Sequence, residues 1–207
     1  MKRLCVLLLI FTSTLMLAGC QTNEEDIDLT TLPYYSYLSE DNPVVTIKIK
    51  SYGEIKLQLF PDVAENTVNN FISYIEEGSY SRSTFHRIIE DFMIQGGIVS
   101  DTGCTIKGEF TANGERNSLS HDRGVISMAR TYVNNSATSQ FFIVHKDSDF
   151  LDGSYAAFGG MISGFNILDE LAQVSTDGSD VPNINIVIRK ISVDLNGYST
   201  GDVICAD

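Results

Sequence analysis

Positive charge is scarce in this sequence. Its 207 residues include 14 Lys and Arg against 27 Asp and Glu, which gives a formal net charge of −13. Nucleic acids and anionic lipid surfaces recruit proteins through clustered Lys and Arg. We therefore expect no nucleic-acid partner, and we interpret the acidic surface as a means of staying soluble.

The motifs that hold metals, dinucleotides and phosphates are also missing. The cysteines form no Cys-x-x-Cys pair, and His86, His121 and His145 lack metal-like spacing, so each histidine is expected to be structural or exposed. The glycines at 159–160 and 164 form neither a dinucleotide fingerprint nor a phosphate loop. We expect no metal and no cofactor.

The apolar run Leu4–Leu17 is shorter than the ~20 residues that a membrane-spanning helix needs. It follows Lys2 and Arg3 and ends in the letters LAGC at 17–20, which is typical of a signal peptide over 1–19. These four letters resemble the bacterial lipobox, and that resemblance implies cleavage before Cys20 and attachment of lipid to it. An ordinary secretory signal with a chance cysteine is the alternative, but all three parts of the pattern favour a lipoprotein.

Residues 20–43 follow the predicted cleavage site, and their composition is acidic and polar. We interpret them as a flexible tether that lifts a folded domain from the membrane. Tyr34, Tyr35 and Tyr37 could instead dock on that domain or contact the bilayer. The expected location is a bacterial cell membrane, facing outside the cytoplasm, and Gln21 is compatible with an outer membrane if the source has one.

Two cysteines remain once the predicted signal and the lipid have taken Cys5 and Cys20. Cys104 and Cys205 would then lie in a compartment that permits disulfides. A bridge between them would tie the C-terminal tail to the body of the protein. The sequence alone does not decide whether they pair.

Residues 44–194 have the length of one ordinary domain. Apolar residues alternate with polar ones over 45–49 and 55–59, which predicts a β-hairpin. Helical spacing predicts helices from Pro61 to Gly78 and over 165–174. Further short strands are predicted at 125–129, 140–144, 156–159 and 184–193, and 195–207 is a polar tail. Short strands without βαβ alternation favour an antiparallel barrel or sandwich covered by helices.

The stretch 85–97 (FHRIIEDFMIQGG) predicts two apolar strands joined at Glu90–Asp91, with one arginine among residues of buried type. Strand alternation would place Phe85, Arg87 and Ile89 on one face. A guanidinium in such surroundings needs a partner, because burying an unpaired charge is costly. An acidic side chain could be that partner, or Arg87 could stand at the rim of an apolar pocket, facing a ligand carbonyl or carboxylate.

Two other candidate sites carry less weight. Ser120–Asp122 contains the residue types of a hydrolase triad, but triad groups converge in space rather than in sequence, and a solvated turn is the expected structure. The acidic composition allows a pair of carboxylates for glycoside hydrolysis, yet nothing in the sequence selects a pair.

Four blocks together resemble the cyclophilins, a family of peptidyl-prolyl cis-trans isomerases. They are FHRIIEDFMIQGG at 85–97, GVISMAR at 124–130, SQFFI at 139–143, and FLDG at 150–153 followed by Phe158 and Gly159. Their shared order makes the resemblance specific, and it extends over about 44–193. It implies a mainly β fold, an eight-stranded antiparallel barrel closed by two α-helices.

The resemblance also implies the roles of individual residues. Arg87 falls on the family's catalytic arginine and, in our interpretation, bonds mainly to solvent and substrate. The residues expected to bind the substrate are Phe92, Met93, Gln95, Ala129, Arg130, Gln140, Phe142, Phe150, Leu151 and Tyr155.

Several positions depart from the family pattern. Phe150 stands where cyclosporin-sensitive members have tryptophan, so strong inhibition by cyclosporin is not expected. Tyr155 replaces a frequent histidine and Arg130 a frequent asparagine, so the Arg130 side chain is expected to take another role. The loop 101–104 and Thr131 are expected to alter the outer subsites.

The function that the resemblance implies is isomerisation of Xaa-Pro bonds in exported polypeptides. The expected protein is a monomer with proline-containing clients, attached to a membrane through lipid on Cys20. The alternative is a non-catalytic module or holdase chaperone that grips proline-containing segments. Arg87 together with a complete apolar pocket favours the enzyme.

Overall fold

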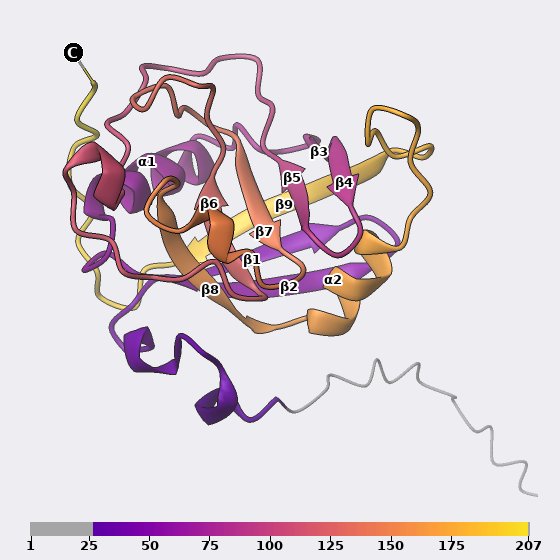
Figure 1. Cartoon of the computed structure of the whole chain (residues 1–207), viewed down its shortest axis with the longest axis horizontal. Helices are drawn as coiled ribbons and strands as arrows, with labels where there is room; N and C mark the ends of the chain where they lie inside the picture. Colours follow the sequence, from indigo (N-terminus) through magenta and orange to yellow (C-terminus); the bar gives the residue numbers. More distant parts are fainter. Residues whose placement is uncertain (1–26, 207) are drawn as a thin grey trace, which may run out of the picture.

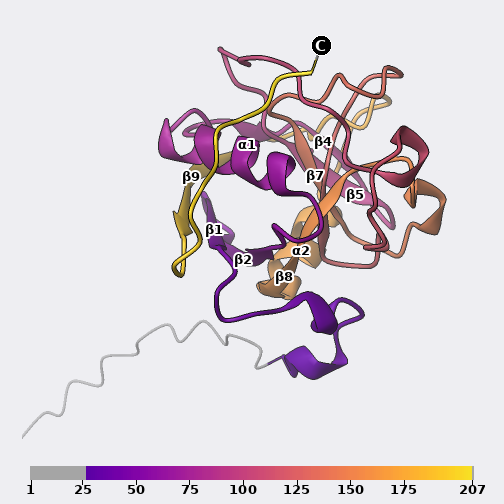
Figure 2. The ribbon, with the colours of Figure 1, turned by 90° about the vertical axis from the view of Figure 1, so that its left-hand side faces the viewer.

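One antiparallel sheet forms a nearly closed barrel in this protein. The computed structural model describes residues 27–206, and nine strands occur among them in the order β3-β9-β1-β2-β8-β6-β7-β5-β4. They are β1 (Val44–Ile49), β2 (Gly53–Leu59), β3 (Thr84–Phe85), β4 (Arg87–Ile89), β5 (Met93–Gly96), β6 (Val125–Met128), β7 (Phe141–Val144), β8 (Ala157–Ser163) and β9 (Ile186–Asp194). Helices α1 (Glu65–Glu76) and α2 (Phe165–Ala172) lie over the two open ends of the barrel (Figures 1 and 2). The predicted barrel with two helices is confirmed.

The barrel closes through the short segment 84–89. Its first part, β3, pairs with β9, and its second part, β4, pairs with β5. Counted as one strand, this segment gives the eight strands that were predicted. The change of partner breaks the strand at His86, so Phe85 and Ile88 point into the barrel core while Arg87 lines an outer pocket. The prediction that Phe85 shares a face with Arg87 is wrong, because strand alternation does not continue across the break.

Apolar side chains form two layers around the sheet. Ile88, Ile94, Ile143 and Ile126 are neighbours in register across β4, β5, β7 and β6, and all four lie in the core inside the barrel. The alternate positions face outward, where Met93, Phe142 and Val144 belong to a second buried cluster. Period-two alternation on these strands therefore builds both the core and the floor of a surface pocket.

Helix α1 begins at Glu65, four residues later than Pro61, where the sequence predicted it. No side chain at its N-cap, Ala64, accepts a hydrogen bond. The carboxylate of Glu109 takes that place, accepting from the backbone N–H of Asn66 at 3.2 Å and of Thr67 at 2.6 Å. A distant acid thus satisfies the free N–H groups of the first turn, where negative charge is favourable.

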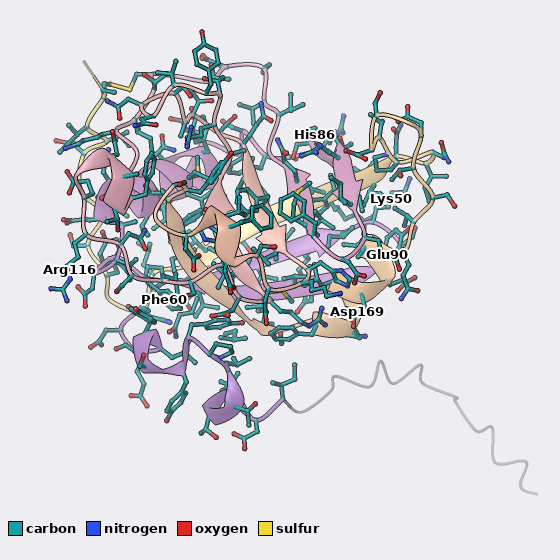
Figure 3. All side chains as sticks on the ribbon, in the orientation of Figure 1. Lys50, Phe60, His86, Glu90, Arg116 and Asp169 are labelled. Carbon is teal, nitrogen blue, oxygen red and sulfur yellow. A yellow bond between two sulfur atoms is a disulfide. The ribbon has the colours of Figure 1, made fainter. Side chains whose placement is uncertain are left out.

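The N-terminal segment from residue 27 to residue 43 packs on the outside of the barrel, below β2 and β8 in Figure 1. Tyr34 is only 1% exposed, and its hydroxyl donates to the carbonyl of Met161 at 2.9 Å. The rings of Tyr34 and Tyr37 contact Phe60, which Figure 3 labels on this side of the barrel. The Tyr34 ring has room because residue 160 is glycine: a Cβ atom added at this position would lie 2.5 Å from the ring.

This packing corrects the expected flexible tether for residues 27–43. Their two 3₁₀ turns, Leu29–Thr31 and Tyr35–Tyr37, belong to a docked segment, and Tyr34 buries an aromatic ring that a tether would leave in water. Residues 20–26, the predicted signal peptide 1–19 and Cys20 lie outside the described residues. No helix within residues 27–206 has both the length and the apolar character needed to cross a membrane.

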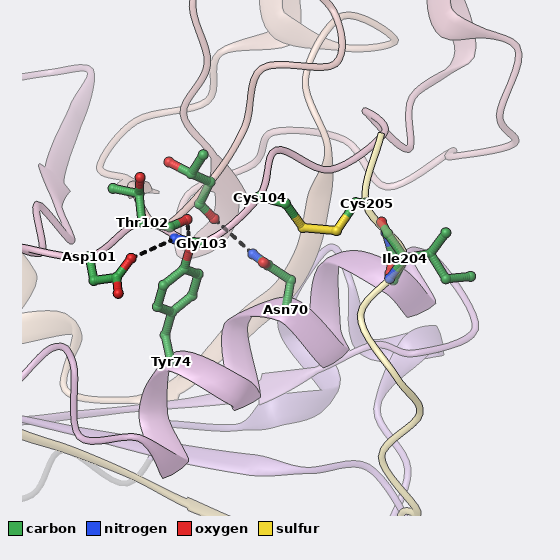
Figure 4. The surroundings of a disulfide bond; sticks show 10 residues. Asn70, Tyr74, Asp101, Thr102, Gly103, Cys104, Ile204 and Cys205 are labelled. Atoms are coloured by element: carbon green, nitrogen blue, oxygen red, sulfur yellow. Dashed lines mark hydrogen bonds between the residues drawn. A yellow bond between two sulfur atoms is a disulfide. The ribbon is translucent and has the colours of Figure 1, made fainter. Parts of the chain in front are cut away.

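The C-terminal tail is ordered along α1. Cys205 forms a disulfide with Cys104, with 5.7 Å between their Cα atoms, which answers the open question of their pairing (Figure 4). Beside it, the hydroxyl of Tyr74 on α1 donates to the carbonyl of Thr102. Asn66, also on α1, accepts from the backbone N–H of Ile204 at 2.8 Å. Helix, tail and loop 101–104 are therefore joined into one unit.

Candidate active site

A pocket opens on the outer face of β4, β5 and β7. Nine of the eleven residues predicted for the site line it together. They are Arg87, Phe92, Met93, Gln95, Ala129, Arg130, Phe142, Leu151 and Tyr155. The other two, Gln140 and Phe150, are adjacent: Gln140 accepts a hydrogen bond from Gln95 at 3.1 Å, and the ring of Phe150 lies 5.4 Å from that of Phe92.

The strand register explains why these residues converge. Arg87 on β4 lies opposite Gln95 on β5, and Gln95 lies opposite Phe142 on β7. Residues paired across neighbouring strands point to the same face, so one row presents a cation, an amide and an aromatic ring side by side. The 3₁₀ turn Asp149–Leu151 adds Leu151 at the edge of this row.

The floor of the pocket is apolar and fixed. Met93, Phe142 and Leu151 are 2%, 5% and 6% exposed, and all three belong to the second buried cluster. Tyr155 meets Phe142 edge to face at 5.9 Å between ring centroids. Such a floor accepts a small apolar ring and does not need to rearrange to do so.

Arg87 is the cation at the rim of this floor, and it has an acidic partner. Its Nε and Nη2 both donate to Oδ2 of Asp180, at 3.2 Å and 3.1 Å. The two side chains are 41% and 40% exposed. The expectation that Arg87 bonds mainly to solvent and substrate is thus wrong in part, because a loop far along the chain brings Asp180 beside it. The structure therefore has both an acidic partner for Arg87 and a place for it at the rim of an apolar pocket, which the sequence offered as alternatives.

Arg130 forms the opposite wall of the pocket with a side chain that is already engaged. Its Nε and Nη2 donate to the carbonyl of Ser154 at 3.1 Å and 2.8 Å, and its Nη1 donates to the carbonyl of Thr131 at 2.9 Å. The guanidinium also lies 4.6 Å from the ring centroid of Tyr155. Its different role was predicted, and the structure shows this role to be bracing the Tyr155 loop.

A chain of three polar groups, of which His121 and Ser127 are buried and Asp152 is partly exposed, supports the pocket from behind. His121 approaches Asp152 through Nδ1 at 2.8 Å and Ser127 through Nε2 at 3.0 Å. Its ring stacks on Phe142 with 6.0 Å between centroids. The solvated turn predicted for Ser120–Asp122 is wrong for His121, which is fully buried because its two partners come from elsewhere in the chain.

This arrangement has the connectivity of a hydrolase triad but not its accessibility. Ser127 is 0% exposed, so no substrate carbonyl reaches its hydroxyl. A carboxylate only accepts hydrogen bonds, so Nδ1 of His121 carries the proton and Nε2 accepts from Ser127. Burial, the largest influence, lowers the pKa of His121. The neutral ring therefore acts as an internal brace for Phe142.

Sequence reasoning missed Asp180 and the Ser127–His121–Asp152 chain. Asp180 is 93 positions from Arg87, and its own neighbours are those of an ordinary polar loop. His121 and Ser127 are six positions apart, a spacing with no meaning outside the folded barrel. No local signal in the sequence could have identified either assembly.

Comparisons with known proteins agree with this geometry. The sequence model of the family described as "Cyclophilin type peptidyl-prolyl cis-trans isomerase/CLD" matches residues 44–193. The chain is 38% identical to peptidyl-prolyl cis-trans isomerase B of Escherichia coli over 157 residues, which cover 69% of this chain and 95% of the relative. It is 39% identical to peptidyl-prolyl cis-trans isomerase A of Dickeya dadantii over 153 residues, covering 69% and 80%.

A solved structure gives the same result in three dimensions. A cyclophilin-type isomerase of Cryptosporidium parvum, crystallised in the presence of the dipeptide Ala-Pro, superposes with a TM-score of 0.67 and 31% identity. The match covers 73% of this chain and 98% of that one.

Proposed function

Because the chain belongs to the cyclophilin-type peptidyl-prolyl cis-trans isomerase family, we propose that Arg87 catalyses Xaa-Pro isomerisation in the pocket described above. The protein is a peptidyl-prolyl cis-trans isomerase. We propose here the catalytic residue, the location of the enzyme in the cell and the class of polypeptide on which it acts. The observation that carries it is the guanidinium of Arg87 at the rim of a floor made of Met93, Phe142 and Leu151.

The reaction needs no nucleophile, no metal and no group that titrates. An amide resists rotation with a barrier of about 18–20 kcal/mol because its C–N bond has partial double-bond character. Xaa-Pro bonds populate both isomers but exchange over tens of seconds or longer. Catalysis therefore requires a surface that fits the twisted bond better than either planar state.

Each part of the pocket has a task in that scheme. The apolar floor holds the pyrrolidine ring while the preceding carbonyl turns. As the bond twists, the proline nitrogen becomes pyramidal and regains a lone pair, which accepts a hydrogen bond from Arg87. Arginine is suited to this because it stays charged and presents its donors in a rigid fork. The amides of Gln95 and Gln140, joined at 3.1 Å, offer hydrogen bonds to the substrate backbone.

The test is the rate at which Arg87→Ala exchanges the isomers of a proline peptide, measured by NMR exchange spectroscopy. We expect kcat/KM to fall about 100-fold, the size of effect that follows loss of one transition-state donor. Arg116→Ala is the matched control, because Arg116 is exposed and lies away from the pocket (Figure 3). A rate for Arg87→Ala equal to that of the parent would reject the assignment.

The second part of the proposal is the location of the enzyme. The sequence pattern over 1–20 supports cleavage before Cys20 and lipidation of that residue at a bacterial cell membrane, outside the cytoplasm. Several acyl chains on one residue would anchor the protein firmly. The seven positions from Cys20 to Ile27 span at most about 25 Å, so the barrel would work close to the membrane on exported proteins.

Replacement of the proposed lipid-bearing cysteine tests this location. Cys20→Ala should move the protein from the membrane fraction to the soluble fraction with unchanged kcat/KM. Cys5→Ala is the control, since Cys5 leaves with the predicted signal. Mass measurement of the mature N-terminus supplies the second readout. An unmodified Cys20 or an intact signal would overturn this part of the proposal and leave the site assignment standing.

A further inference from the structure

The contact between Arg87 and Asp180 is one-sided. Both hydrogen bonds run from Nε and Nη2 to the same oxygen, Oδ2 of Asp180. Within residues 27–206 no side chain or carbonyl accepts from the remaining nitrogen, Nη1. Since Arg87 also lines the pocket, one edge of its guanidinium is held by the protein and another stays available to a bound substrate.

The backbone of Asp180 is fixed to the same strand as its side chain. Its carbonyl accepts from the N–H of Ile88 on β4 at 2.9 Å, directly beside Arg87. The residue adopts a left-handed conformation with φ of +63°, which aspartate tolerates better than most residues. Asp180 is therefore attached to β4 twice, once through its backbone and once through its carboxylate.

A second aspartate builds the loop that holds Asp180 there. Oδ1 of Asp177 accepts from the backbone N–H of Ser179 at 2.8 Å and of Val181 at 3.0 Å. The backbone N–H of Asp180 donates to the carbonyl of Asp177 at 3.1 Å. These bonds close a tight turn around the left-handed residue, so the backbone of Asp180 is placed beside β4 independently of the contact with Arg87.

Stability does not account for this construction. An ion pair whose partners are each about 40% exposed contributes little to folding stability, because water screens it. A non-glycine residue in the left-handed region costs energy of a similar size. The net gain in folding free energy is therefore small, whereas the guanidinium of Arg87 at the pocket rim is held by two hydrogen bonds.

We propose that Asp180 is a positioning residue that orients the guanidinium of Arg87 toward the twisted Xaa-Pro bond. The inference rests on the proposed role of Arg87. A free arginine side chain loses rotamer entropy when it is immobilised. Asp180 removes part of that cost before the substrate arrives, so the donor is in place when the lone pair forms. Arg87 keeps its charge in the pair, because a guanidinium does not lose its proton in proteins.

Two substitutions separate the carboxylate from the backbone of residue 180. Asp180→Gly deletes the side chain and still adopts a positive φ freely, and Asp180→Asn keeps the shape and one acceptor but loses the charge. We expect kcat to fall about 10-fold in Asp180→Gly and about 3-fold in Asp180→Asn, where each 10-fold is 1.4 kcal/mol in the barrier. KM should change less than 2-fold, since the apolar floor is untouched.

The control is Asp91→Asn. Asp91 lies in the turn between β4 and β5 and pairs with Lys146 at 3.3 Å. Asp91→Asn therefore removes the same charge at the hairpin that carries Arg87, without contacting the guanidinium. This variant should keep the kcat of the parent. A backbone amide NMR spectrum of each variant checks that β4 and the loop 175–183 keep their structure.

A double-mutant cycle decides between positioning and general damage. In the Arg87→Ala background, Asp180→Gly should change kcat less than 2-fold, because there is no guanidinium left to orient. A 10-fold loss that persists in that background, or a parental kcat in Asp180→Gly alone, would overturn the role of Asp180 and leave the role of Arg87 intact. A parental rate in Arg87→Ala alone would reject both.

Discussion

Two acidic contacts flank the pocket, and they differ mainly in how far the basic partner, Arg87 or His121, is exposed to water. In the Arg87–Asp180 pair each side chain is about 40% exposed, and the arginine borders the pocket. In the Ser127–His121–Asp152 chain the carboxylate of Asp152 is 35% exposed, but the histidine is 1% exposed and its ring stacks on Phe142. Solvent screens the first and makes its contribution to stability small, whereas the second sits where an unpaired polar group is costly.

This difference in exposure separates two tasks of polar groups, contact with a substrate and support of the pocket floor. The exposed pair can meet a substrate and is free to contribute to the transition state. The buried part of the second chain, His121 and Ser127, meets no substrate, but it supports the Phe142 ring that forms part of the floor. We therefore expect substitutions in the exposed pair to change the rate more than the stability, and substitutions in the buried chain to do the reverse.

Removal of the buried histidine is the largest expected effect on stability. His121→Ala leaves a cavity behind Phe142 and an unpaired hydroxyl on Ser127, so the free energy of unfolding should fall by about 3 kcal/mol. Urea denaturation followed by far-UV circular dichroism measures it. At temperatures where the variant is folded, its kcat/KM should stay within about 5-fold of the parent, which is 1 kcal/mol in the barrier. Parental stability would show that the chain is not a brace.

Acid should weaken the parent protein through the same residue. Burial lowers the pKa of His121 in the folded state below its ordinary value near 6.5, so the unfolded chain binds the proton more readily. The stability from the neutral ring is complete above pH 6.5 and is lost as the pH falls toward the lowered pKa. The maximum slope for one group is about 1.4 kcal/mol per pH unit.

The difference between parent and His121→Ala isolates this contribution. His86, whose pKa burial also lowers, is present in both proteins and cancels. Denaturation curves between pH 7.5 and 5.5 should show the parent losing stability faster than the variant. Parallel losses in the two proteins would contradict the assignment.

Removal of one hydroxyl from the buried chain is the smallest of these effects. Ser127→Ala deletes the donor to Nε2 of His121 and leaves that nitrogen buried without a partner, which costs about 1–2 kcal/mol of stability. The loss should be smaller than that of His121→Ala because no large cavity forms. A loss as large as that of His121→Ala, in the same urea titration, would mean that the serine rather than the ring holds the floor.

The first β-hairpin could be predicted from the sequence because its information is local, whereas the choice of a barrel over a sandwich came from the family resemblance. Period-two alternation over 45–49 and 55–59 directly encodes one buried face, and the structure has a hairpin there. The break at His86 could not be predicted in this way. The segment 84–89 pairs first with β9 and then with β5. Closure of the whole sheet determines this change of partner, and the alternation of inward and outward side chains is lost at that point.

The docked N-terminal segment shows a second limit. Its polar and acidic composition is typical of a flexible tether, but burial of the Tyr34 ring docks the segment on the barrel. Tyr34 fits because glycine at 160 leaves a space for it, 126 positions away in the sequence. Composition reports the average character of a segment, whereas docking depends on one complementary contact.

The pocket was predicted through resemblance, and its supports were not. The blocks that resemble the cyclophilins contain Arg87, Phe142 and Leu151 themselves, so their convergence followed once the family was suspected. Asp180 and His121 act through partners that only the folded chain brings within 3.2 Å. Residues that touch a substrate can be found by motif, while residues that orient them require coordinates.

The most direct test of this account measures the exchange rate and the unfolding free energy of one sample of Arg87→Ala. We expect kcat/KM to fall about 100-fold, as for loss of one transition-state donor. The free energy of unfolding should change by less than about 1 kcal/mol, because the exposed partner Asp180 becomes solvated. A folded variant that exchanges the proline peptide at the rate of the parent would contradict the account.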